Sequence, residues 1–134
     1  MGPLIRPAAP TIHLDTSFLI RALDPSSNES ARLLGWLREH RALAVSTLAW
    51  GEFLCGPLGD EDRALARRLV QRRVPFGTAE AAEAARFFNH GGRRRGSFAD
   101  CAIAATAVMD GAELATSDPS DFDRLRDAGV KLAG

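Results

Sequence analysis

Three mostly apolar segments of this chain each contain a single formal charge, and each time it belongs to a carboxylate. The segments are residues 7–20 with Asp15, residues 42–59 with Glu52 and residues 96–109 with Asp100. An isolated acid in a segment that folds into the core is unfavourable unless its charge is compensated. One metal ion shared by several acids compensates all of them at once, so the pattern favours a metal site.

Acids that converge on one site repel one another. Two carboxylates about 4 Å apart cost roughly 4 kcal/mol at an effective dielectric near 20, and protonation or a cation must relieve that repulsion. A site made of carboxylate oxygens, with no histidine or cysteine at ligand spacing, suits Mg²⁺ or Mn²⁺. Such an ion activates water and stabilises charge on a phosphodiester, so the pattern indicates phosphoryl chemistry.

Each acid also has a structural interpretation. Asp15 could cap a helix that begins directly after it, and Asp100 lies in a first helical turn, where the helix dipole favours an acid by roughly 0.3–1 kcal/mol. Asp118, which precedes Pro119, has the pattern of a helix N-cap, and capping is the simpler interpretation of that residue alone. Glu52 is hardest to explain this way, because its helix is apolar on most sides and is expected to be buried.

The elements that must position these acids follow from hydrophobic periodicity and turn residues. Strands are predicted at residues 11–14, 43–45, 74–76, 113–115 and 130–132, and helices at 16–23, from Ser26 or Ser27, and at 47–55, 60–73, 78–89, 98–109 and 121–127. This alternation predicts an α/β fold with a mostly parallel sheet and helices on both faces. Ligands of such sheets lie beyond the carboxyl ends of the strands, where we expect Asp15 and Asp118. Asp121 and Asp123 are expected to be surface acids of the last short helix.

Composition limits the classes of protein. A length of 134 residues predicts one domain, which we place at residues 11–134, after a proline-rich and flexible extension at residues 1–10. The 17 basic and 17 acidic residues cancel, which argues against a protein that coats polyanions but allows a local basic patch. Two cysteines without metal-ligand spacing indicate a reduced, cytoplasmic protein. The apolar runs are too short for a membrane span.

Four motifs in order carry a resemblance to a known family. They are Leu14-Asp15-Thr16-Ser17, Glu52 in the second helical region, the segment Asp100-Cys101-Ala102-Ile103-Ala104-Ala105, and Thr116-Ser117-Asp118-Pro119-Ser120-Asp121-Phe122. Each motif alone is weak, but together and at this spacing they resemble a PIN domain, and in particular the compact VapC-type toxins of bacteria. The resemblance extends from about Thr11 to Leu132.

The resemblance implies a three-layer α/β/α fold and a metal-dependent ribonuclease. It implies that Asp15, Glu52, Asp100 and Asp118 hold Mg²⁺ or Mn²⁺, and Ser17 and Thr116 match positions that line such a site with hydroxyl groups. It also implies an RNA substrate, a VapB-type antitoxin that blocks the site, and a homodimer. A housekeeping RNA-processing nuclease of the same fold and a non-catalytic binding module stay open as alternatives.

A loop of consecutive arginines precedes the third acid. Arg93, Arg94 and Arg95 lie between glycines at residues 91, 92 and 96, shortly before Asp100. Their guanidinium groups could contact RNA phosphates. A solvated loop, or a patch that contacts an acidic antitoxin segment, explains the same residues.

Overall fold

A computed structural model describes residues 9–134 of the chain. The N-terminal extension expected at residues 1–10 lies outside the described residues, apart from the exposed Ala9 and Pro10. Within 9–134, each helix is too short or too polar to cross a lipid bilayer.

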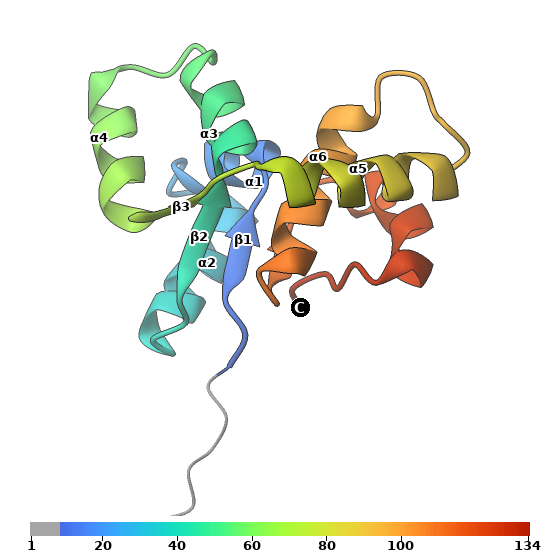
Figure 1. The fold of residues 1–134 in the computed structure, drawn as a ribbon. Helices are drawn as coiled ribbons and strands as arrows, with labels where there is room; N and C mark the ends of the chain where they lie inside the picture. Colours follow the sequence, from blue (N-terminus) through green and yellow to red (C-terminus); the bar gives the residue numbers. More distant parts are fainter. Residues whose placement is uncertain (1–8) are drawn as a thin grey trace, which may run out of the picture.

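Four parallel strands form one sheet in the order β3-β2-β1-β4, so the expected α/β fold is confirmed (Figure 1). The elements are β1 (Ile12–Leu14), α1 (Thr16–Ala22), α2 (Asn28–Arg38), β2 (Leu43–Ser46), α3 (Thr47–Leu54), α4 (Asp60–Leu69), β3 (Arg72–Val74), α5 (Thr78–His90), α6 (Phe98–Met109), β4 (Glu113–Ala115) and two 3₁₀ helices, η1 (Pro119–Asp121) and η2 (Asp123–Ala128).

The strand order determines which helices cover which face. The chain moves outward from β1 through β2 to β3 and then returns across the sheet to β4. Since crossovers between parallel strands are right-handed, α1 to α4 belong to one face, and α5 and α6 to the other. The result is the three-layer arrangement that the resemblance implies.

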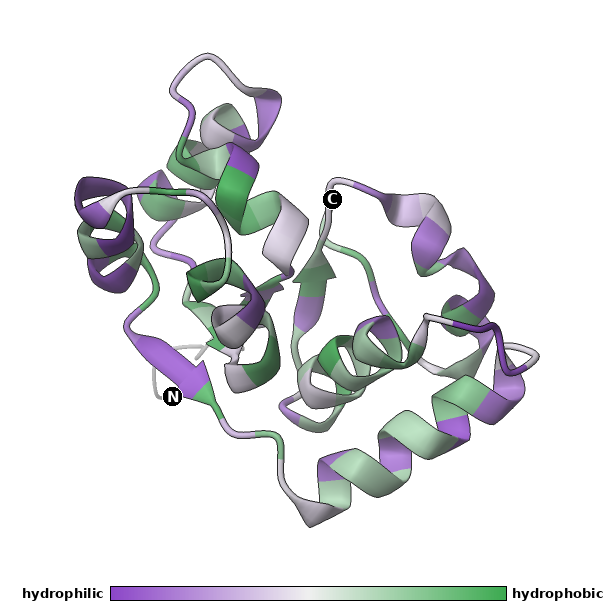
Figure 2. Cartoon of the chain, turned by 90° about the horizontal axis from the view of Figure 1, so that it is seen from above, coloured by the Kyte–Doolittle hydropathy of each residue, from purple (hydrophilic) through white to green (hydrophobic). Residues whose placement is uncertain are grey.

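The centre of the sheet is buried on both faces. Every residue of β1 and β2 is buried, as expected for parallel strands covered by helices. Four phenylalanines fill the space between sheet and helices: Phe18, Phe53, Phe87 and Phe122. Figure 2 shows the hydrophobic colouring concentrated in these inner segments, with hydrophilic residues on the outer turns. This packing fixes the strand ends, and therefore the positions of the residues that follow them.

The predicted boundary between the fourth helix and the third strand is wrong. Helix α4 ends at Leu69 instead of residue 73, and β3 covers Arg72–Val74 instead of residues 74–76. Two charged residues thus stand in a strand. Arg73 packs its guanidinium over the ring of Trp50, 4.5 Å from the centroid, and Arg72 forms an ion pair described below. Tertiary partners therefore override the amphipathic helical pattern.

The C-terminal elements are also less regular than expected. The strand predicted at residues 130–132 is reduced to one parallel bridge between Leu114 and Leu132. The helix predicted at residues 121–127 is replaced by η1 and η2, which Gly129 ends in a left-handed conformation with φ of 119°. Gly tolerates this conformation because it has no Cβ.

A polar network ties the middle of the sheet to α6. His13, Ala44 and Arg72 pair side by side across β1, β2 and β3, so their side chains share one face. The small Ala44 leaves room for Arg72 to reach Asp110 at the end of α6, with N–O distances of 2.6 and 2.5 Å. The buried His13 places its Nε2 2.8 Å from the same carboxylate. This network secures α6, whose first turn carries Asp100.

Candidate active site

Asp15 directly follows β1 and begins α1. The residue is only 6% exposed. Oδ1 accepts hydrogen bonds from the Phe18 amide at 2.8 Å and from the Ser17 hydroxyl at 3.0 Å. The predicted N-cap is therefore confirmed, and the Ser17 hydroxyl also contacts the carboxylate. Capping uses one oxygen atom, so this structural role is compatible with a second role for the carboxylate.

Burial makes the charge of Asp15 unfavourable. It raises the pKa of Asp15 above the ordinary value of 3.8 more strongly than any other effect. Hydrogen bonds from Thr116, Phe18 and Ser17 act in the opposite direction, and the negative charge of Asp118 raises the pKa again. Asp15 and Asp118 thus lie near enough to repel, at the carboxyl ends of the neighbouring strands β1 and β4.

Asp100 lies in the first turn of α6 and is half-buried. Burial is the largest cause that raises its pKa, followed by the negative charges of Asp121, Asp15 and Glu52. Asp100 is therefore the residue at which charges from three other segments of the chain converge. An acid in the first turn gains from the helix dipole, but here that gain does not prevent the upward shift.

Glu52 is exposed, so the expectation that it is buried is wrong. Helix α3 buries Ala49 and Phe53 instead, which turns the Glu52 side chain outward. Its Oε1 accepts a hydrogen bond of 2.8 Å from the hydroxyl of Thr16, in the first turn of α1. This bond holds the glutamate beside the residue that follows Asp15. Glu52 therefore reaches the same edge of the sheet from the solvent side.

Asp118 does not cap η1, contrary to its simpler interpretation. It occupies the N-cap position, but its side chain forms no capping hydrogen bond and is exposed. Its backbone N–H donates to the hydroxyl of Thr116 at 3.0 Å. Thr116 is buried and also contacts Asp15, so it links the loop after β4 to the end of β1.

Asp121 is the residue that sequence reasoning placed wrongly. It was expected to be a surface acid, but it is half-buried at the end of η1 and is the strongest negative influence on Asp100. Asp123, by contrast, is exposed and pairs with Arg126 at 3.0 Å. The signal available in the sequence was the position of Asp121 three residues after Asp118, in a turn that folds back toward the strand ends.

A cation that the sequence did not single out lies among these acids. Nη1 of Arg124 donates to the backbone oxygen of Asp121 at 2.6 Å, and its charge lowers the pKa of Asp100. Nε and Nη2 are buried without a hydrogen-bond partner among the described residues. Gly91 makes room for this side chain, since a Cβ there would lie 2.9 Å from Nε. Arg124 therefore connects the acids with the start of the arginine loop.

The arrangement fits a hard divalent cation by its donor chemistry. Five carboxylates gather at one edge of the sheet: the charge of Asp118 acts on Asp15, and the charges of Asp121, Asp15 and Glu52 act on Asp100. No three of the His, Cys, Asp and Glu side chains in residues 9–134 are grouped closely enough to ligate one ion by themselves. Mg²⁺ keeps several waters and needs only one or two carboxylates, so a looser group of acids is compatible with it.

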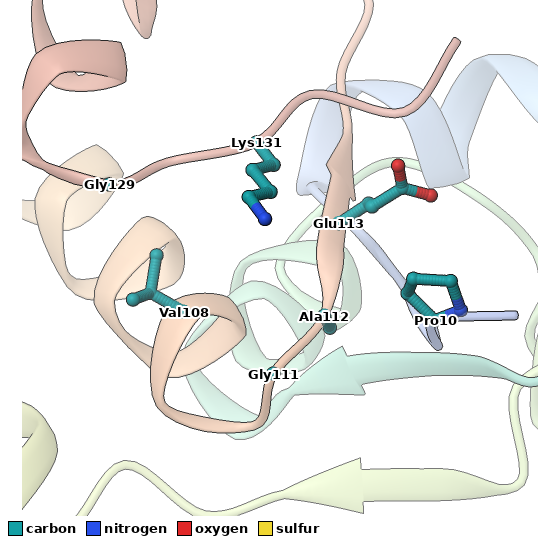
Figure 3. Close-up of a pocket in the computed structure, with 7 residues that line it drawn as sticks. All are labelled: Pro10, Val108, Gly111, Ala112, Glu113, Gly129 and Lys131. Atoms are coloured by element: carbon teal, nitrogen blue, oxygen red, sulfur yellow. The ribbon is translucent and has the colours of Figure 1, made fainter. Parts of the chain in front are cut away.

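The acids do not lie in the cavity that Figure 3 shows. That cavity, of about 360 Å³, is lined by Pro10 before β1, by residues 111–113 at the start of β4, by Val108 near the end of α6, and by Gly129 and Lys131, whose ammonium group points into it. It therefore lies at the amino ends of the strands, at the edge of the sheet opposite to the acids. Because ligands of parallel sheets bind beyond the carboxyl ends, we place the candidate site at the acids.

A known protein family covers nearly all of the described residues. The PIN domain family matches residues 12–128, nearly the whole described chain. The chain belongs to the PIN domain family. No curated protein sequence matches it significantly.

Solved structures share this PIN fold over nearly their full length. FitAcB from Neisseria gonorrhoeae is 26% identical, with a TM-score of 0.68 over 92% of this chain and 97% of the other. VapBC2 from Rickettsia felis, bound to a DNA fragment from its promoter, is 16% identical with a TM-score of 0.72 over 92% and 97%. VapC20 from Mycobacterium tuberculosis, described as a sarcin-ricin loop cleaving toxin, is 17% identical with a TM-score of 0.62 over 92% and 98%.

Proposed function

We propose that this chain is a divalent-metal-dependent ribonuclease and the toxin component of a VapBC-type toxin–antitoxin system. The observation that carries the proposal is the group of carboxylates at the carboxyl ends of β1 and β4, where burial and mutual repulsion raise the pKa of both Asp15 and Asp100. A protein that needed only capping acids there would gain nothing from this repulsion. PIN nucleases generally use divalent metals, which relieve it.

Asp15, Glu52, Asp100 and Asp118 are the proposed acids of a Mg²⁺ or Mn²⁺ site, and we add Asp121 to them. One or two of the carboxylates would bind the ion directly, and the others would bind its water molecules. When bound, the ion would activate a water molecule and neutralise charge on the RNA phosphodiester. Ser17 and Thr116 would keep the Asp15 carboxylate in one orientation through their hydroxyl groups. Asp118 is exposed and makes no capping bond, so it is available to accept a proton from the attacking water.

The proposed partner is an antitoxin of the VapB type, encoded beside this chain. The support is structural: FitAcB, FitAB and several VapBC complexes share the fold of this chain. RNA is the proposed substrate, because the VapC20 toxin of the same fold is described as cleaving the sarcin-ricin loop. We also propose that the chain forms a homodimer.

Cleavage of RNA by purified chain, free of antitoxin, tests the activity. We expect cleavage with Mg²⁺ or Mn²⁺, none with EDTA, and products with a 5′-phosphate. Asp100→Asn should abolish cleavage and keep the native circular dichroism spectrum, whereas Asp123→Asn, which removes an acid outside the site, should cleave normally. Equal cleavage by wild type and Asp100→Asn would refute the assignment.

Growth assays distinguish a toxin from a processing nuclease. Expression of this chain should arrest growth, and expression with the adjacent antitoxin gene should restore it. Metal-dependent cleavage without growth arrest, and without an adjacent antitoxin gene, would instead identify a housekeeping nuclease. A chain that binds RNA without turnover in any divalent metal would be a binding module.

A further inference from the structure

The loop between α5 and α6 has a fixed backbone and free arginine side chains. The Arg93 amide donates to the Phe88 carbonyl oxygen at 2.9 Å, and its Nε donates to Asn89 at 2.8 Å. The Ser97 hydroxyl donates to the Arg94 carbonyl oxygen at 2.6 Å. Arg94 and Arg95 are exposed, and their guanidinium groups form no hydrogen bond or ion pair with the rest of residues 9–134. Figure 2 shows this hydrophilic segment joining the two helices.

An exposed aromatic ring follows these arginines closely in the chain. Phe98, the first residue of α6, is 47% exposed. Its ring meets that of Phe88 edge to face, with the centroids 6.0 Å apart and an angle of 72° between the planes. This contact supports the ring and leaves much of it in solvent. A single exposed phenylalanine is ordinary, but a supported ring that follows two unpaired cations within four residues is a combination that suits a particular ligand.

The position of the patch relates it to the candidate active site. Phe98 and Asp100 both lie in the first turn of α6, and Arg124, which lies against Gly91 at the start of the loop, donates to the backbone oxygen of Asp121 at 2.6 Å. A polyanionic substrate that approached five carboxylates would be repelled without nearby cations. Arg94 and Arg95 supply such cations in the loop that leads into the helix of Asp100, on a chain whose net charge is zero.

We propose that Arg94, Arg95 and Phe98 form a binding surface for single-stranded RNA that leads into the candidate active site. The two guanidinium groups bind successive phosphates, and the phenyl ring stacks on an unpaired base. The combination favours a nucleic acid over an acidic peptide, because a base offers a flat face to the ring between charged phosphates. The connection to cleavage rests on the proposed function, whereas the binding surface stands on its own residues.

A second pair of arginines provides a matched control. Arg67 and Arg68 are consecutive and exposed on α4, at the opposite side of the molecule from the arginine loop (Figure 1). Their substitution removes the same two charges without touching the proposed surface. Any difference in RNA binding between the two double variants therefore reflects where the arginines lie and not the change in net charge.

Fluorescence anisotropy of a labelled single-stranded RNA tests the proposal, in EDTA and in an Asp100→Asn background so that no cleavage occurs. Arg94→Ala/Arg95→Ala should reduce the slope of log K against log salt by about 1.4, which is about 0.7 for each lost phosphate contact. Phe98→Ala should weaken binding by roughly 5- to 150-fold, and Phe98→Trp should restore it. Arg67→Ala/Arg68→Ala should leave the salt slope unchanged.

Two results would overturn the proposal. One is an equal loss of RNA binding in the two double-arginine variants. The other is normal RNA binding by Arg94→Ala/Arg95→Ala together with loss of antitoxin binding. That second result would assign the surface to a peptide. Failure of the binding surface is distinguishable from failure of the ribonuclease. If the wild type cleaves RNA with metal but the surface variants bind RNA normally, only the proposed binding surface is refuted. If the surface variants lose RNA binding selectively but the wild type never cleaves RNA, only the proposed nuclease activity is refuted.

Discussion

Substitution of Asp15 by asparagine should stabilise the metal-free protein and remove stabilisation by metal. Asparagine is as good an N-cap as aspartate, so the bond from the Phe18 amide is kept. The amide group of the variant can also donate to Thr116, whose hydroxyl accepts as well as donates. What changes is the charge, which is buried and lies near Asp118.

The expected magnitude comes from opposing contributions. At an effective dielectric near 20, repulsion from one carboxylate is about 4 kcal/mol at 4 Å and about 2 kcal/mol at 8 Å. A neutral acceptor weakens each of three hydrogen bonds by about 1 kcal/mol. Because the pKa of Asp15 is raised despite those bonds, burial and repulsion outweigh them. We expect a net gain of about 1–2 kcal/mol for Asp15→Asn at pH 7, or a Tm about 4–8 °C higher.

The pH dependence provides an internal check. A carboxyl group whose folded pKa is raised stabilises the protein in its protonated form, and that stability is lost as the pH rises through the folded pKa. The gain in free energy of unfolding from Asp15→Asn should therefore be largest at neutral pH and disappear as the pH falls toward 3.8, the ordinary pKa of an aspartate.

Urea unfolding in EDTA, and again with Mn²⁺, measures both effects. In saturating Mn²⁺ the wild type should gain about 2.7 kcal/mol at a concentration 100 times the Kd, and Asp15→Asn should gain much less. Asp123→Asn, which removes an exposed acid, should match the wild type within about 0.5 kcal/mol in both conditions. An Asp15→Asn protein that is less stable than the wild type in EDTA at pH 7 would refute the reasoning.

Three further substitutions test other parts of the structure. Asp110→Asn should lower the free energy of unfolding by about 1–2 kcal/mol at pH 7. Because Arg72 holds the pKa of Asp110 below its ordinary value, this difference in stability from the wild type should disappear as the pH falls through that low pKa. Equal stability of the two proteins at pH 7 would contradict the prediction. Arg124→Met should raise the pKa of Asp100 further, measured by carboxyl-carbon NMR titration in EDTA, because it removes a compensating cation. Asp121→Asn should lower the pKa of Asp100 in the same titration and reduce RNA cleavage at least about tenfold; an unchanged titration would show that the two acids do not interact.

The order of elements and the acids at the strand ends could be predicted from the sequence, because both depend on local patterns. A buried strand followed by Asp15 and a helix is readable from periodicity and capping preferences. Register is different, since it depends on partners far away in sequence. The shift of β3 to Arg72–Val74 depends on Asp110 and Trp50, neither of which lies near it in the chain.

The site was predictable only in part for the same reason. An apolar helix indicated that Glu52 would be buried, but a whole face of α3 meets solvent, with Gly51 and Glu52 both exposed. The hydrogen bond from Thr16 explains the place of Glu52. Asp121 and Arg124 were not found because the η1 and η2 turns bring them to Asp100 through tertiary folding, which leaves no periodic signal.

The central claim is that these carboxylates hold a divalent ion, and an anomalous difference map from crystals soaked in Mn²⁺ tests it most directly. We predict a peak within coordination distance of at least one oxygen of Asp15 or Asp100, about 2.0–2.6 Å, and no peak in crystals of Asp15→Asn treated alike. Absence of a peak at the carboxyl ends of β1 and β4 in wild-type crystals, or a peak only elsewhere on the chain, would contradict the claim.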